Sequence, residues 1–217
     1  MKKDFSFYEF TGVIVPGSTL LLGMAVISDP LRQFLASDKF GAGQLGLFVV
    51  ASYIIGHLVQ GIGNLIENGW WAFRGMPSTW IRRQKVPFLN DGQLKRLREV
   101  LTTLLGHDPG ELTKLDVRTS RNITGQLYAR LEKEGRVTRI EIFNGNYGLF
   151  RGIAASLLVV TVVTVAKHGF WSQATLITSS ILVVALLRMN RFGVYYASEL
   201  YRQALNLAEP PKPAITP

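Results

Sequence analysis

The chain has 217 residues, of which 47% are hydrophobic and 18% are charged, and its formal net charge is +9. It contains no cysteine, which excludes disulfides, thiolate catalysis and thiolate metal sites. The mean hydropathy of +0.19 predicts apolar blocks separated by charged ones. If the apolar blocks span a membrane, the basic charge is explained by Lys and Arg that collect on the cytoplasmic side and meet anionic lipid. Nucleic-acid binding is the alternative explanation of the basic charge.

Residues 1–66 are predicted to hold an interfacial N-terminus and two transmembrane helices. Residues 1–10 mix charges with four aromatic side chains, which indicates a short amphipathic helix at the membrane surface. The first apolar run, residues 11–28, could be a signal peptide. Two acids ahead of it, the interruption by Pro16 and Gly17, and Pro30 soon after it favour an uncleaved span.

A polar stripe marks the second predicted span, residues 43–66, and continues one residue beyond it. At 100° per residue its side chains fall within about 120° of arc, and aliphatic side chains cover the rest. The polar stripe consists of Tyr53, His57, Gln60, Asn64 and Glu67. In lipid it must face protein or water, so it either lines a pore between copies or forms interhelical hydrogen bonds within a four-helix bundle. No metal site is expected, because His57 and Glu67 lie about 15 Å apart along the axis.

Residues 67–147 form the polar block of the chain, with 14 basic and 9 acidic residues. Trp70, Trp71, Trp80 and Phe73 predict an aromatic belt where the chain leaves the bilayer. Asn90 or Asp91 should cap a helix that runs to Leu105 and ends at Gly106. A second helix is predicted from about Ser120 to Glu134, where Gly135 ends it. This block therefore predicts a small, mainly helical, basic cytoplasmic domain.

A basic patch in this block is predicted to bind lipid headgroups or a partner protein. Its members are Arg82, Arg83, Lys85, Lys95, Arg96 and Arg98. The order of helix, glycine and basic strand over residues 127–139 also resembles a winged helix. That order is common, so a solvated, lipid-facing domain is favoured over nucleic-acid recognition.

Residues 148–187 predict a transmembrane hairpin, because only Lys167, His168 and Gly169 separate two apolar runs. Arg151 and Arg188 can snorkel to one interface. Residues 188–217 predict an amphipathic cytoplasmic helix and a disordered tail. Four spans place both termini on one side, which the positive-inside rule makes cytoplasmic.

The segments YEFTGVIVPG, GHLVQGIGNLIE, NYGLFRG and RFGVYYASELYR resemble small four-pass bacterial inner-membrane proteins, some of which accompany anti-phage defence genes. The resemblance implies a bacterial cytoplasmic membrane protein and an effector that perturbs the membrane. The chain lacks a phosphate loop, HExxH, GxSxG and paired intramembrane aspartates, so neither an enzyme nor a cofactor is predicted.

The predicted fold is all-α, a polytopic membrane protein with four transmembrane helices and a cytoplasmic domain between the second and third. The predicted function is an oligomeric, channel-like or membrane-perturbing effector controlled through that domain. The alternative is a non-conducting scaffold that recruits a cytoplasmic protein or nucleic acid. Expected partners are the lipid bilayer, further copies of the chain and a cytoplasmic protein.

Overall fold

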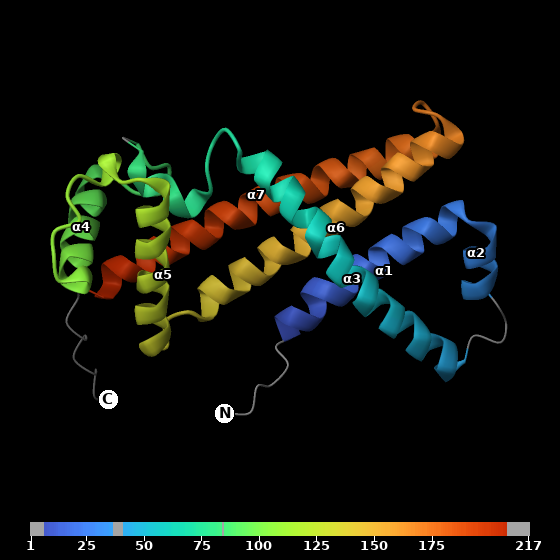
Figure 1. The fold of residues 1–217 in the computed structure, drawn as a ribbon, viewed down its shortest axis with the longest axis horizontal. Coiled ribbons are helices and arrows are strands. Elements are labelled where there is room, and N and C mark those ends of the chain that lie inside the picture. Colours follow the sequence, from blue (N-terminus) through green and yellow to red (C-terminus); the bar gives the residue numbers. More distant parts are fainter. Residues whose placement is uncertain (1–6, 37–40, 84, 208–217) are drawn as a thin grey trace, which may run out of the picture. The chain divides into compact units, whose positions relative to one another are not determined.

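The computed structural model describes residues 7–36, 41–83 and 85–207, and within these ranges every regular element is a helix (Figure 1). This confirms the all-α class. Three helices are long and apolar enough to cross a membrane, and a bent pair makes a fourth if it is counted as one span. The expected interfacial segment falls largely on residues 1–6, which lie outside the described residues, as does the expected tail from residue 208 onward.

The chain forms two compact units. Residues 1–73 and 145–192 make up one, which we call the apolar unit. Residues 74–144 and 193–217 make up the other, which we call the polar unit. Two long helices, α6 (Thr138–His168) and α7 (Gln173–Leu207), contribute residues to both.

The apolar unit begins with α1 (Phe7–Ile27), which contains Pro16, and α2 (Asp29–Leu35). A bend of 116° separates these two helices. The sequence predicted only a connection at α2, but Pro30 stands in its first turn, where a missing N–H costs no helical hydrogen bond. The next helix, α3 (Ala42–Trp71), runs five residues beyond the predicted end of the second span.

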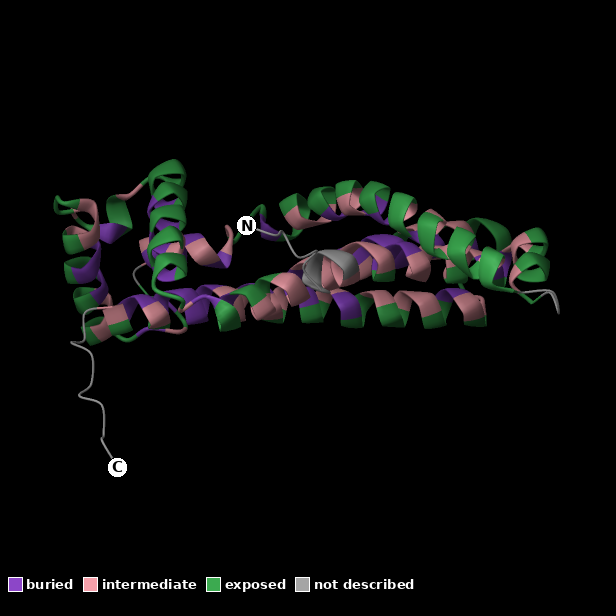
Figure 2. Cartoon of the chain, turned by 90° about the horizontal axis from the view of Figure 1, so that it is seen from below, coloured by how far each residue is buried: buried purple, intermediate pink, exposed green. Residues whose placement is uncertain are grey.

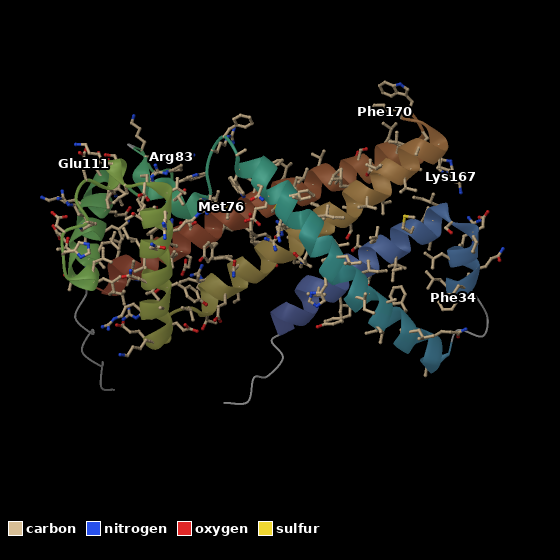
Figure 3. The ribbon with its side chains drawn as sticks, in the orientation of Figure 1. Phe34, Met76, Arg83, Glu111, Lys167 and Phe170 are labelled. Atoms are coloured by element: carbon tan, nitrogen blue, oxygen red, sulfur yellow. The ribbon has the colours of Figure 1, made fainter. Side chains whose placement is uncertain are left out.

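The predicted helical hairpin is present. Helix α6 ends at His168 and α7 begins at Gln173, and Gly169 between them has a φ of +83°, which suits glycine. Figure 3 labels Lys167 and Phe170 at this turn. Within the hairpin Ala154 and Leu157 pack against Ala185, and the long helices keep much exposed surface (Figure 2).

The polar unit has its own hydrophobic core. Two 3₁₀ turns, η1 (Pro77–Arg82) and η2 (Leu112–Lys114), accompany the helices α4 (Asp91–Leu105) and α5 (Val117–Lys133). Leu97, Leu101, Leu127, Leu131 and Ile140 are fully buried there, together with Leu200 and Tyr201 from the end of α7.

Helix ends in the polar unit follow the local sequence. The Asn90 side chain accepts a hydrogen bond from the Gln93 amide, and Gly106 adopts a left-handed conformation, so α4 has its predicted bounds. Asp116 caps α5 through the Thr119 amide, so α5 begins three residues earlier than predicted.

The chain is helical from Thr138 to His168 and again beyond Leu187. The basic strand of the disfavoured winged-helix alternative is absent after Gly135, because α6 already begins at Thr138. The helix expected after Leu187 is a continuation of α7 and not a separate element. No proline interrupts the chain there, so the helix has no reason to stop.

Candidate functional site

The buried face of α3 packs against α1 at backbone distance. A Cβ atom placed on Gly17 would lie 1.8 Å from the carbonyl oxygen of Ser52, and one on Gly56 would lie 2.1 Å from that of Val13. The Ser18 hydroxyl also donates to the Ser52 hydroxyl at 3.0 Å. Small residues therefore set this helix pair, as they do in many membrane bundles.

Gln60 of the polar stripe donates a hydrogen bond that the backbone of α1 lacks. Proline has no N–H, so Pro16 leaves the Gly12 carbonyl without its usual helical donor. The Gln60 side-chain amide donates to that carbonyl oxygen at 2.6 Å. Gly152 of α6 provides the space for the proline ring, since a Cβ there would lie 2.6 Å from its Cγ atom.

A polar cluster forms where α3 meets α6. The Arg151 guanidinium pairs with the Glu67 carboxylate and donates to the Gln60 side-chain oxygen at 3.0 Å. The side chains of Arg151 and Glu67 are 22% and 18% exposed. Arg151 also lies over Gly63, whose Cβ would be 3.2 Å from its Cγ atom. We call Gln60, Glu67 and Arg151 the polar cluster.

The polar stripe is thus divided between two environments. Gln60 and Glu67 make interhelical contacts, whereas Tyr53, His57 and Asn64 are exposed. The Tyr53 and His57 rings contact each other edge to face, with centroids 4.7 Å apart. On a helical wheel, Gln60 and Glu67 lie on the side nearest the buried glycines, which explains the division.

Sequence reasoning missed Arg151, which was expected to snorkel outward. A signal for the inward position does exist: Gly63 leaves room one turn before Glu67, and Arg151 is a lone cation within an apolar run. An unpaired charge in that environment is costly, so the sequence implies a partner carboxylate for Arg151.

The expected aromatic belt is wrong for two of its tryptophans. Trp71 and Trp80 are only 4% and 8% exposed. The Trp71 indole donates to the Tyr147 hydroxyl at 2.9 Å, and the Trp80 indole donates to the Arg74 carbonyl at 2.9 Å. These rings serve packing within their own units, and Phe73 is exposed.

The predicted basic patch is not one continuous set of cations. Arg82 donates to the Leu115 carbonyl, and Arg83 lies over the Trp80 ring with its Cζ atom 4.2 Å from the centroid. Partial burial lowers the pKa of Arg83. Lys85 is exposed.

On α4, Arg98 donates two hydrogen bonds to Asp108, at 3.1 and 2.6 Å. These hydrogen bonds hold the pKa of the Asp108 carboxyl below its ordinary value. Lys95 and Arg96 line a groove to which Arg98 does not contribute.

Lys95 and Arg96 line a groove of about 690 Å³ that we call the α4–α5 groove. The apolar residues of its lining are Val100, Leu104 and Leu207. Charged side chains also line the groove, and Thr103 and Gly92 complete the lining. The charged members are Lys95, Arg96, Glu99, Arg130 and Glu134. Such a surface can hold an amphipathic segment, because apolar contacts and charges lie side by side.

Within the described ranges, no group of three or more His, Asp or Glu side chains could hold a metal ion. His107 and His168 are both exposed, and His107 contacts the Leu105 carbonyl through Nδ1 at 3.1 Å. A scan of protein-family models and searches of curated proteins and solved structures return no match to this chain.

Proposed function

We propose that this chain is a non-conducting, multi-pass scaffold of the bacterial inner membrane that recruits a cytoplasmic protein through its polar unit. In this proposal α1, α3, α6 and the first half of α7 are the four spans. The 14 basic residues between positions 67 and 147 favour a cytoplasmic location for that segment, because the proposed external connections hold only Arg32, Lys39 and Lys167. Both termini then lie in the cytoplasm.

The α4–α5 groove is the observation that carries the proposal. Its apolar lining residues offer contacts to the hydrophobic face of a helix, and Lys95 and Arg96 can meet acidic residues at the edge of that face. Glu99 lies in the same lining and would repel a phosphate, and Glu134 already pairs with Arg130, so a protein suits this groove better than nucleic acid does.

The polar cluster supports a scaffold over a channel. Gln60 and Glu67 were expected to face a water-filled axis in a channel-like effector. Their contacts with Gly12 and Arg151 engage both side chains within one chain. A carboxylate that is already paired contributes little to a ring of negative charge at a pore mouth.

Site-specific photocrosslinking in cells tests the groove. A photoreactive residue in place of Thr103, which lines the groove, should give a discrete adduct, and Lys95→Glu should remove it. The same residue in place of the exposed Thr113, outside the groove lining, is the matched control. Equal adducts from both positions, or none from Thr103, would contradict recruitment through the groove.

Topology and conduction are tested separately. Alkaline phosphatase fused after His168 should be active, and the same enzyme fused after Asp108 should be inactive. The purified protein in liposomes should pass no ions. Active enzyme at Asp108 would reverse the orientation, and flux that Glu67→Lys alters would favour the channel.

A further inference from the structure

Part of α3 presents polar side chains on an exposed surface. Tyr53, His57 and Asn64 are exposed and project within one arc, and we call them the exposed polar face. His57 lies close to the middle of α3, a helix long and apolar enough to cross a membrane. Gly61 lies between His57 and Asn64, and a Cβ there would meet no atom within 4 Å.

Hydrocarbon cannot satisfy these groups. An imidazole and a carboxamide near the centre of a span lose their hydrogen bonds to water and gain none from lipid tails. The α1–α3 contact does not relieve them, because it uses the opposite edge of the stripe, at Gln60. A protein surface with matching donors and acceptors is therefore the occupant that the exposed polar face requires.

We infer that the occupant is a second copy of this chain, joined through the same face. Every copy inserts with the same topology, so two copies in one bilayer are related by rotation about the membrane normal, and equivalent residues face each other. Asn64 then meets Asn64 of the second copy, and His57 meets His57. A carboxamide and a neutral imidazole each carry a donor and an acceptor, so both are complementary to themselves. Gly61 permits the close approach of the two backbones that such hydrogen bonds need.

This inference rests on the proposed placement of α3 in the membrane but does not depend on recruitment at the α4–α5 groove. Two copies paired through α3 would give the scaffold two grooves for one assembly. Multivalent binding then follows without any new contact to the partner.

Disulfide mapping in native membranes tests the pairing. The chain has no natural cysteine, so every crosslink between copies must come from the introduced one. His57→Cys and Asn64→Cys each leave the other polar residue in place and should crosslink on mild oxidation, since a disulfide needs Cβ atoms within about 4.5 Å. Leu58→Cys and Leu65→Cys are matched controls: they are 69% and 71% exposed and project about 100° further round the helix. They should crosslink at least tenfold less. Equal crosslinking at all four positions would overturn the inference.

A second measurement does not depend on cysteine chemistry. Native mass spectrometry of the full chain in mild detergent should show a dimer, and the double substitution His57→Leu with Asn64→Leu should shift it to monomer with unchanged expression. If the natural sequence gives only monomer, the pairing is overturned. A photocrosslinked adduct at Thr103 would still support the scaffold, so the two failures are distinguishable. Labelling of His57→Cys by a membrane-impermeant maleimide would instead show that α3 is in water, which overturns both the placement and the pairing.

Discussion

The side-chain amide of Gln60 donates to the backbone carbonyl of Gly12, and the two atoms are 2.6 Å apart. Pro16 deprives that carbonyl of its donor, so a polar residue of α3 completes the hydrogen bonding of α1. The same side chain accepts from Arg151 of α6. One glutamine therefore links three helices of the apolar unit.

Gln60→Leu should destabilise the chain by about 1–3 kcal/mol, because it leaves a partly buried carbonyl without a donor. In a Pro16→Ala background the cost should be smaller, since the new backbone N–H can bond Gly12. A double-mutant cycle by unfolding in mixed micelles measures this coupling. Asn64→Leu is the control, because Asn64 is exposed and its cost should not depend on residue 16. Equal losses of unfolding free energy from Gln60→Leu in both backgrounds would show that Gln60 does not replace the hydrogen bond that Pro16 cannot donate.

Gly17→Ala and Gly56→Ala should each push α1 and α3 apart. The new methyl group meets a backbone oxygen at 1.8 or 2.1 Å, and backbone cannot rotate away as a side chain can. We expect a loss of about 1–3 kcal/mol for each. Gly69→Ala is the matched control within α3, because nothing lies within 4 Å of that site and alanine favours a helix. Melting temperatures in detergent that fall equally for all three variants would contradict the close packing.

Breaking the ion pair of the polar cluster should cost more than removing it. Glu67→Gln or Arg151→Met leaves a charge without its partner in a poorly hydrated place, at a cost of up to about 3 kcal/mol. The double variant Glu67→Gln with Arg151→Met should cost less than the two single variants together. Unfolding free energies of the four proteins give the interaction directly. Strict additivity would mean that the pair contributes nothing.

Local signals in the sequence predict much of the polar unit. Asn90 and Gly106 bound α4 because capping depends on a few neighbouring atoms. The start of α5 was missed because Asp116 is as good a cap as Ser120, and only the surrounding packing selects one of them. The sequence disfavours a winged-helix strand after Gly135, and the chain there is helical from Thr138.

In the apolar unit, hydrophobic periodicity does not predict which side chains of α3 contact other helices. A helical wheel placed five polar side chains on one arc, but it could not tell which edge would meet α1 and α6. That division depends on Gly56 and Gly63, which let other helices approach one side of α3. The partner of Glu67 lies 84 positions away along the chain, at Arg151, so no local pattern contains it.

Carboxylates of the polar unit that accept hydrogen bonds should make the chain sensitive to acid. Arg98 lowers the pKa of Asp108, Lys114 lowers that of Glu111, and the Thr119 amide lowers that of Asp116. A carboxyl whose pKa is lower in the folded chain stabilises it above the unfolded pKa and loses that contribution as the pH falls through the folded value. Stability should therefore decline below about pH 4.

Thermal unfolding of the full chain in detergent, followed by circular dichroism between neutral and acidic pH, measures this decline. Asp108→Asn should lower stability at neutral pH and flatten the decline, because the carboxyl that must be protonated is gone. Arg98→Met should flatten it in the same way by removing the cause of the lowered pKa, and combining the two substitutions should add little. An unchanged acid profile in both single variants would show that the contact between Arg98 and Asp108 does not contribute to folding.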